Sequence, residues 1–153
     1  MFNQTSEYAL RAMVWIAGKK EGFTSAPEIA EMAQVPLDYL SKILRILGNA
    51  SLLERKRGLR GGFKLKKPPD LISILDIVEI FDQIKRIEQC PLGLKGHAES
   101  LCPLHRKLDH VIREYKCQLS STSLADLLRK DALPLCLHHK AKAFCSIEQP
   151  SLV

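Results

Sequence analysis

The chain has 153 residues, of which 46% are hydrophobic, and a formal net charge of +6 at neutral pH. This length predicts one domain, or one domain with an added oligomerisation element, and the positive charge suits a polyanionic partner. The sequence has no apolar run of the roughly 18 residues that a transmembrane helix needs. Because the N-terminal segment contains Glu7 and Arg11, it resembles a folded helix more than a signal peptide. We therefore expect a cytoplasmic protein without a membrane association.

Two helices are predicted in the first part of the chain. Apolar residues recur at helical spacing over residues 4–18. Ser25 and Glu28 have the spacing of a capping box, and Pro27 suits a first helical turn, so a second helix begins near residue 26 and ends near Ala33. With the helix that follows, this one forms either a helix-turn-helix or a plain antiparallel hairpin.

A helix and a basic, glycine-rich ribbon occupy the segment from Leu37 to Leu65. The apolar residues of the helix have the spacing of one buried face: Leu37, Leu40, Ile43, Leu44 and Leu47. Gly48 and Asn49 tolerate the left-handed conformation and are expected to end the helix. A hairpin with a sharp tip follows, because glycines stand at positions 58, 61 and 62. A helix followed by a cationic hairpin is the arrangement of a winged helix-turn-helix, which places the helix in the major groove of DNA.

Exposed polar residues of this segment are candidates for contact with DNA. The recognition helix offers side chains that can reach base edges or phosphates: Asp38, Tyr39, Ser41, Lys42 and Arg45. On the wing, Arg57 and Arg60 lie among the glycines of the tip, and arginine at such a tip favours a narrow minor groove. For Lys64 and Lys66, a solvated surface charge explains the sequence equally well.

The second half predicts a helix, an irregular loop and a long amphipathic helix. Ser73 and Asp76 suit the start of a helix after the second wing strand. The stretch from residue 90 to residue 100 has no periodicity and is expected to be a loop. Pro103 suits the first position of a helix of about 16 residues, with Cys102 at its cap.

The long helix carries an apolar stripe that has little to pack against in a small domain: Leu104, Leu108, Val111, Ile112, Tyr115 and Leu119. Such a stripe predicts a homodimer joined through this helix. Ser121 or Ser123 is expected to cap a last short helix over residues 124–129. The expected fold is mainly α with a small β wing, divided as follows: winged helix-turn-helix domain, 1–82; sensor loop, 83–102; dimerisation helix with a short packing helix, 103–130; tail, 131–153.

Five cysteines in a chain without an export signal argue against a disulfide framework and favour free thiols, a metal site or a redox role. Cys102 is expected to be the more reactive thiol of the loop, because it stands at a helix N-terminus. Cys117, inside the long helix, is expected to be a small core residue. The tail holds a group of further candidate ligands whose spacing matches no common zinc pattern: Cys136, His138, His139 and Cys145.

Taken together, these segments resemble the IscR/NsrR/CymR family of bacterial winged-helix repressors. The matching stretches are SEYALR (6–11), VPLDYL (35–40), RGLRGGF (57–63), ILDIVE (74–79), Cys90 with CPLH (102–105), and TSLADL (122–127). The resemblance covers the chain from residue 1 to about residue 130. It implies a dimer that binds operator DNA and carries an iron–sulfur cluster controlling that binding. It also places Ser41 and Lys42 where family members read base edges.

The loop departs from the family pattern at its middle cysteine. Cluster-binding members usually have three cysteines here, and the outer two correspond to Cys90 and Cys102, whereas Lys-Gly-His occupies residues 95–97. By resemblance, His105 matches a histidine that completes the cluster in some members. Glu7 matches a residue that supplies an acidic ligand from the second chain of the dimer in some members. His97 lies near the position of the missing cysteine. A two-iron, two-sulfur cluster accepts mixed ligands, and zinc also suits thiolates with imidazoles. A metal-free pair of thiols remains an alternative.

The sequence therefore predicts a homodimeric DNA-binding transcriptional regulator, a repressor by resemblance, controlled by the cluster or thiol state of the loop from Cys90 to His105. Two alternatives remain: a cluster- or metal-carrying protein for electron transfer or assembly, and a cluster-free regulator controlled by a partner protein. Catalysis is not expected, because the sequence has no nucleophile–base pair and no phosphate loop in the required context. No small-molecule substrate is indicated.

Overall fold

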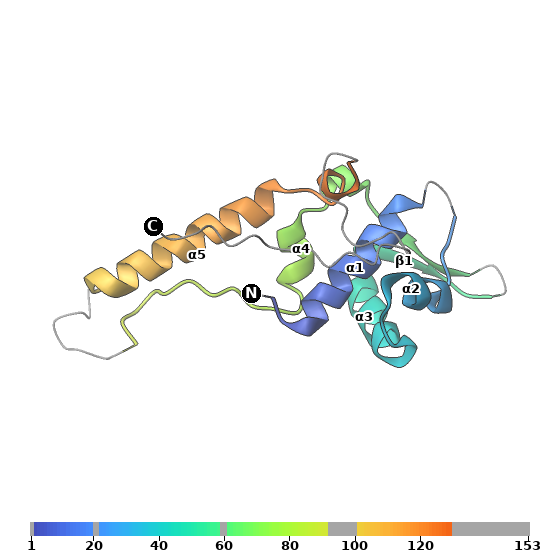
Figure 1. Cartoon of the computed structure of the whole chain (residues 1–153), viewed down its shortest axis with the longest axis horizontal. Coiled ribbons are helices and arrows are strands. Elements are labelled where there is room, and N and C mark those ends of the chain that lie inside the picture. The colour runs from blue at the N-terminus through green and yellow to red at the C-terminus, as the bar shows by residue number, and fades with distance from the viewer. Residues whose placement is uncertain (1, 20–21, 59–60, 92–100, 130–153) are drawn as a thin grey trace, which may run out of the picture.

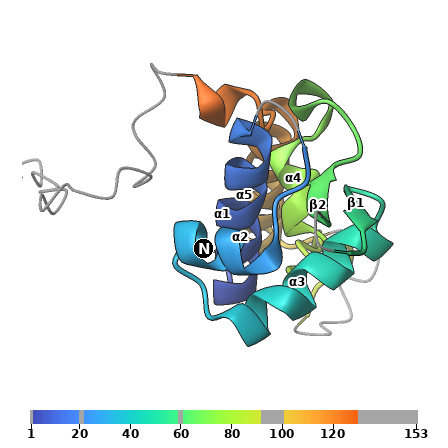
Figure 2. The ribbon, with the colours of Figure 1, turned by 90° about the vertical axis from the view of Figure 1, so that its right-hand side faces the viewer.

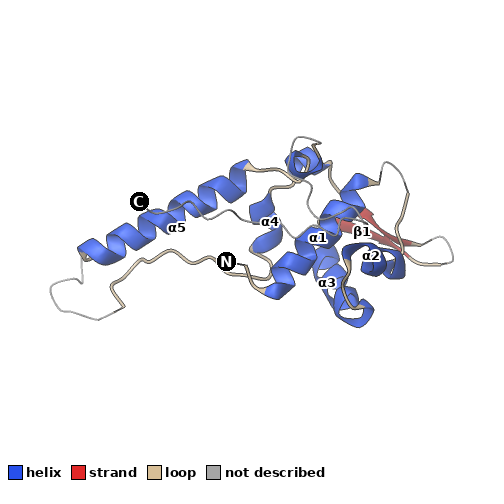
Figure 3. Cartoon of the chain, viewed as in Figure 1, coloured by secondary structure: helices blue, strands red, loops and turns tan. Residues whose placement is uncertain are grey.

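The computed structural model describes residues 2–19, 22–58, 61–91 and 101–129. The helices are α1 (Gln4–Gly18), α2 (Ala26–Ala33), α3 (Leu37–Asn49), α4 (Ile74–Val78) and α5 (Pro103–Ser121), with 3₁₀ turns at Pro69–Leu71 and Asp126–Leu128. Strands β1 (Leu53–Lys56) and β2 (Gly62–Leu65) form one antiparallel pair. Helices α1–α4 and the strands form a head, and α5 extends away from it (Figures 1 and 3). Among the described residues, no helix is both long and apolar enough to cross a membrane.

Helix α1 is the centre of the head and packs against α2, α3, α4 and β2. Its Ala9 and Ala12 are completely buried, and their small side chains let the neighbouring helices approach closely. Met13 of α1 and large apolar side chains from the surrounding elements fill the remaining space: Ile29, Leu40, Ile43, Leu44, Leu47, Ile72, Ile77 and Leu124. Each fully buried side chain of this size contributes about 1.5–3 kcal/mol through removal from water.

The predicted helix starts are confirmed by their caps. The Oδ1 atom of Asn3 accepts a hydrogen bond from the backbone nitrogen of Ser6 (2.8 Å) at the start of α1. Ser25 caps α2 in the same way. Ser73 and Asp76 form a reciprocal capping box at α4. These side chains satisfy backbone groups that have no partner within the helix, which fixes where each helix begins.

Three details of the sequence interpretation are wrong. Helix α3 ends at Asn49, as expected, but Gly48 and Asn49 are helical and the left-handed residue is Ser51 (φ 62°). Leu37 is 43% exposed, because the packed face of α3 begins one turn later, at Leu40. The expected helix over residues 124–129 contains a single 3₁₀ turn, since the Asp126 carboxylate accepts hydrogen bonds from the backbone and hydroxyl of Ser123 and so holds the chain in a tight turn.

Helix α5 lies outside the apolar core. Cys102 caps it and Pro103 begins it, as the sequence predicts, but it has 19 residues rather than about 16. Much of its predicted apolar stripe is exposed: Leu104, Leu108, Val111 and Tyr115. Cys117 is exposed as well, so its assignment to the core is wrong. These side chains are exposed because no described residue of α5 belongs to the buried apolar core of the head.

The wing is attached to the head through the backbone of Thr24. In the wing, Lys56 pairs with Gly62 across the two strands. Thr24 and Phe63 exchange two backbone hydrogen bonds (2.9 and 2.8 Å), so a residue between α1 and α2 extends the sheet. Gly62 has φ 147°, and a Cβ atom at this position would lie 2.2 Å from the Thr24 oxygen. The close approach of the two backbones therefore requires glycine at position 62.

We expect Gly62→Ala to lower the free energy of unfolding by about 1–3 kcal/mol, because a side chain there strains the backbone and separates the wing from Thr24. Gly48→Ala is the matched control. The nearest atom to a Cβ at this helical position is 4.0 Å away, and alanine in a helix is favoured over glycine by about 0.5–1 kcal/mol. Chemical unfolding of both variants tests this; a Gly62→Ala protein as stable as the parent would show that the contact with Thr24 does not constrain position 62.

Candidate functional site

An open hollow of about 520 Å³ separates α3 from the wing. Figure 2 shows α3 and the two strands side by side. The first turn of α2, the outer face of α3 and the wing all contribute to its lining: Ser25, Ala26, Ser41, Arg45, Arg55, Lys56, Arg57, Gly58, Gly61, Gly62 and Phe63. The described lining contains four cationic side chains and no carboxylate, so the hollow attracts anions.

The structure brings some of the predicted DNA-contact residues together at this hollow. Ser41 and Arg45 line it from α3, and Arg57 lines it from the wing. Tyr39 and Lys42 are exposed on α3 but are not part of the lining. Arg60 lies outside the described residues.

Sequence reasoning did not select the other basic residues of the lining, Arg55 and Lys56. They belong to the same basic run as Arg57, so a signal for them was present in the sequence. Ser25 was recognised only as a helix cap. Its place beside the hollow depends on the contact between Thr24 and the wing, which has no signal in the local sequence.

Tyr39 connects the recognition helix to α1. Its hydroxyl lies 2.6 Å from Thr5 Oγ1 in a hydrogen bond, and its ring packs edge to face against Tyr8 with the ring centres 5.8 Å apart. The guanidinium of Arg11 lies over the Tyr8 ring. The first turns of α1 and α3 are therefore held together by an aromatic contact and a hydrogen bond.

The lysines of the wing differ from its arginines in their surroundings. Lys64 lies opposite Glu54 in the strand pair and forms an ion pair with it (3.1 Å), and its ammonium also lies 4.9 Å from the centre of the Phe23 ring. Lys66 donates a hydrogen bond to Ser51 (3.4 Å). Both lysines thus have partners within the wing region, which supports a structural role for them.

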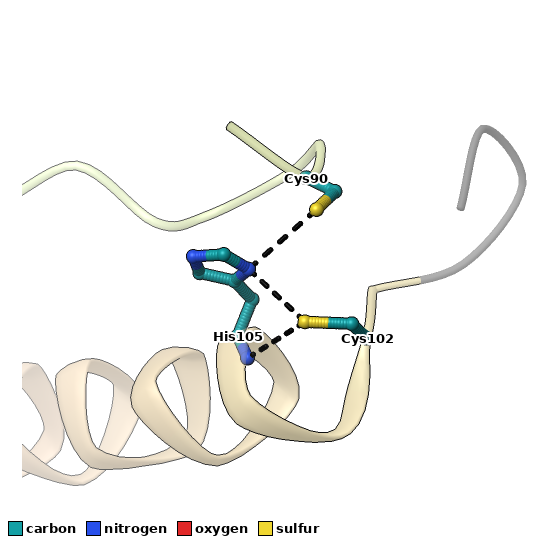
Figure 4. Close-up of side chains that lie close together, drawn as sticks. All are labelled: Cys90, Cys102 and His105. Carbon is teal, nitrogen blue, oxygen red and sulfur yellow. Dashed lines mark hydrogen bonds between the residues drawn. The ribbon is translucent and has the colours of Figure 1, made fainter. Parts of the chain in front are cut away.

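A second group of candidate functional side chains lies at the start of α5 (Figure 4). Cys102 and His105 belong to the first turn of this helix, and Cys90 approaches from the preceding segment. The Nδ1 atom of His105 lies 3.1 Å from Cys102 Sγ and 3.6 Å from Cys90 Sγ. The three potential ligand atoms lie within 4.8 Å of one another, and all three residues are half-buried. We call this group the Cys–Cys–His site.

The arrangement of these residues matches three of the four ligand positions around a tetrahedral metal ion. Zinc–sulfur and zinc–nitrogen bonds of about 2.0–2.3 Å place tetrahedral ligand atoms about 3.5 Å apart, close to the distances from Nδ1 to the two sulfurs. Figure 4 shows Nδ1 directed toward both sulfur atoms. Thiolate and imidazole suit zinc and iron, and a two-iron, two-sulfur cluster needs four protein ligands, of which this group supplies three.

Glu7 does not lie beside the Cys–Cys–His site of its own chain. Its side chain is exposed on α1 and borders a hollow that Gln118 and Leu119 also line, near the far end of α5. At a rise of 1.5 Å per residue, Gln118 is about 24 Å along the helix from Cys102. A ligand role for Glu7 therefore requires a second chain.

The remaining predicted ligands cannot be placed. His97 lies outside the described residues, as do all four candidate ligands of the tail: Cys136, His138, His139 and Cys145.

Cys90 is brought to the site by residues 83–90, which we call the strap. The strap runs along α5 in the opposite direction (Figure 1). At its beginning, Lys116 Nζ donates a hydrogen bond to the Ile84 oxygen (3.4 Å). In its middle, the Asp109 carboxylate accepts hydrogen bonds from the Arg86 side chain and the Ile87 backbone. The two contacts fix the course of the strap toward His105.

Asp109 is ionised at neutral pH although it is buried. The hydrogen bond from Arg86 lowers the pKa of Asp109 to about 2, against the opposing effect of burial, and the backbone of Ile87 adds to the lowering. The same carboxylate raises the pKa of Arg86. An arginine and an aspartate 23 residues apart give no signal in the sequence, so this pair could not have been predicted.

Comparison with known proteins agrees with these features. Residues 2–130 match the family Rrf2, described as an iron-dependent transcriptional regulator. A protein of Aquifex aeolicus (strain VF5) named as an HTH-type transcriptional regulator is 30% identical over 131 residues, which cover 84% of this chain and 91% of that protein.

Solved structures show the same fold. CymR, the global cysteine regulator of B. subtilis, superposes with a TM-score of 0.68 at 30% identity, over 83% of this chain and 95% of that one. IscR of T. potens superposes with a TM-score of 0.69 at 24% identity, over 84% and 85% of the two chains, and supports the fold alone. The predicted winged-helix fold and family resemblance are confirmed, and these relatives are regulators rather than enzymes. The chain belongs to the Rrf2 family of transcriptional regulators.

Proposed function

We propose that this regulator is a homodimeric repressor that binds operator DNA, and that the state of the Cys–Cys–His site sets its affinity for DNA. The observation that carries DNA binding is the basic hollow between α3 and the wing. Its cationic side chains come from both walls of the hollow, Arg45 from α3 and three others from the wing, and α3 presents polar residues to solvent. This is the arrangement needed to hold a phosphate backbone while a helix enters the adjoining major groove.

Each side of the hollow has a distinct role in this proposal. Ser41 and Lys42, exposed on α3, read base edges. Tyr39 and Arg45 contact the same groove or its phosphates. Arg55 and Lys56 neutralise phosphates, whereas Arg57, with Arg60 beside it in the sequence, reaches the minor groove. The positive end of α2 at the edge of the hollow adds a further attraction for phosphate.

Dimerisation follows from the exposed stripe of α5. Leu104, Leu108 and Val111 are between 44% and 61% exposed on a single helix, which is unfavourable in water. Pairing of two such stripes would bury them and place two recognition helices in successive major grooves, about 34 Å apart. In this proposal, residues 1–82 bind DNA, residues 83–102 sense the signal and residues 103–130 join the two chains.

A continuous set of contacts supports coupling between the Cys–Cys–His site and α3. Just before the strap, Asp82 Oδ2 and the Phe81 oxygen accept hydrogen bonds from the backbone and side chain of Asn3 (2.9 and 3.0 Å). Asn3 is also the cap of α1, and Thr5 in the first turn of α1 bonds to Tyr39 of α3. A change in the position of the strap would therefore act on the recognition helix and shift the population of DNA-binding conformations.

A two-iron, two-sulfur cluster is the favoured cofactor. Cys90, Cys102 and His105 would hold it, with His97 or Glu7 of a second chain as the fourth ligand. Such a cluster supplies iron–thiolate bonds whose stability depends on redox state. If no cluster binds, the two cysteines provide a thiol pair at the same place, and the same strap connects their oxidation state to α1.

We expect Arg55→Ala to weaken binding to DNA of all sequences and to reduce the slope of log affinity against log salt by about 1, because one phosphate contact is lost. Arg129→Ala is the matched control, since Arg129 follows the 3₁₀ turn at Asp126–Leu128, is exposed and does not line the hollow. The measurement is fluorescence anisotropy at several salt concentrations, with a duplex enriched by selection with the wild-type protein. Equal salt slopes for the two variants would contradict the proposed interface.

We expect Cys90→Ala combined with Cys102→Ala to remove iron and sulfide from protein purified without oxygen, and to abolish any dependence of DNA affinity on redox state. Cys117→Ala is the control, because Cys117 is exposed on α5 and is not part of the site. Metal analysis, absorption spectra and DNA-binding assays test this. A colourless parent whose redox-dependent binding is lost in the double variant would select the thiol alternative. A double variant that matches the parent in every assay would refute control by this site.

A further inference from the structure

Asp109 is the buried ionised side chain among the residues that the structure describes, with 9% of its surface exposed. Its two oxygens accept three hydrogen bonds. Oδ1 accepts from Arg86 Nε (2.8 Å) and from the Ile87 backbone nitrogen (3.1 Å), and Oδ2 accepts from Arg86 Nη2 (2.5 Å). The carboxylate thus holds one side chain and one backbone group of the strap at the same time.

These contacts lie close to the Cys–Cys–His site on both segments. Asp109 follows His105 by one turn of α5, and Ile87 precedes Cys90 by three residues of the strap. Two of the potential ligands belong to one helix end, because Cys102 caps α5 and His105 lies in its first turn. The third belongs to an extended segment without a strand partner in the described structure. The position of Cys90 relative to the other two therefore depends on how the strap is fixed to the helix.

Simple stabilisation does not explain an ion pair in this place. The Arg86 side chain is 47% exposed, and such pairs add little to stability because desolvation and ordering offset the attraction. Apolar contacts could hold the strap against α5, but they would tolerate sliding. A two-pronged guanidinium–carboxylate contact accepts one geometry. Sliding by one residue would move Cys90 by about 3.3 Å, far more than the few tenths of an ångström that a ligand position tolerates.

We propose that the pair of Asp109 and Arg86, together with the Ile87 amide, positions Cys90 in register with Cys102 and His105. Asp109 and Arg86 are positioning residues that touch no ligand atom themselves. This inference rests on the proposed function, in which the Cys–Cys–His site binds a metal or acts as a thiol pair.

Cobalt(II) is the probe for the metal-bound form, because its thiolate charge-transfer absorption reports how many cysteines coordinate it. We expect Asp109→Asn and Arg86→Gln to weaken cobalt binding by about 10–100-fold, as outer-shell changes do at other metal sites. We also expect their charge-transfer absorption to fall toward that of Cys90→Ala. Glu28→Gln is the matched control, since it removes an ion pair of the same length, with Lys19, far from the site.

A second measurement on metal-free protein separates positioning from metal binding. Diamide removes two electrons and two protons from two thiols, and peptide mass spectrometry then measures how fast the Cys90–Cys102 disulfide forms. We expect this rate to fall at least about tenfold in Asp109→Asn and Arg86→Gln, because the effective concentration of one thiol near the other falls when the strap is not held. Circular dichroism and thermal unfolding identify any variant that does not fold, and Arg86→Gln is the milder change because Arg86 is half-exposed.

Together, the two measurements distinguish failure of the positioning role from failure of metal binding at the site. Normal cobalt binding and normal disulfide rates in both folded variants would overturn the positioning role and leave the metal site in place. If wild-type protein binds no cobalt, the site does not hold a single divalent ion, the iron and sulfide analysis decides the cluster, and the disulfide rates alone decide the positioning role: slower rates in both variants support it, and unchanged rates overturn it.

Discussion

The burial of α1 is the constraint on which the rest of the structure depends. This helix contacts α2, α3, α4, β2 and the 3₁₀ turn at Asp126–Leu128, so displacing it would separate nearly every other element of the head. Its small residues Ala9 and Ala12 have no exposed surface, which means that larger side chains would push neighbouring helices apart. Through this packing, α1 fixes the recognition helix and the wing relative to each other, and so determines the shape of the basic hollow.

The same helix lies between the two functional regions. Its cap, Asn3, bonds to Phe81 and Asp82 just before the strap, and its first turn bonds to Tyr39 through Thr5. The strap in turn ends at Cys90. The path from the Cys–Cys–His site to α3 thus runs through the strap, which hydrogen bonds hold against α5, and then through the first turn of α1. In the proposed function, a shift of the strap acts on α3 through these contacts and requires no large rearrangement of the core.

Charged residues have two different uses in this molecule. Lys64 is balanced by Glu54 and by the Phe23 ring, and Asp109 is balanced by Arg86, so these charges fix local geometry. Arg45 and Arg57 line a hollow whose described lining has no carboxylate, so their charge remains available to an anionic partner. The distinction between a structural charge and a binding charge depends on the neighbours of each residue, and a count of basic residues in the sequence does not reveal it.

The sequence by itself determined the local features: the starts of α1, α2, α4 and α5, the two wing strands and the candidate ligands Cys90, Cys102 and His105. The helix starts and strands follow from helical spacing, capping residues and glycines, all of which act within a few positions along the chain, whereas the candidate ligands came from the family resemblance. Tertiary structure alone decided the contact of Thr24 with the wing, the exposure of Cys117 and the pairing of Arg86 with Asp109. These depend on residues brought together across long stretches of chain, or on whether a helix face meets a neighbour, and periodicity carries no information about either.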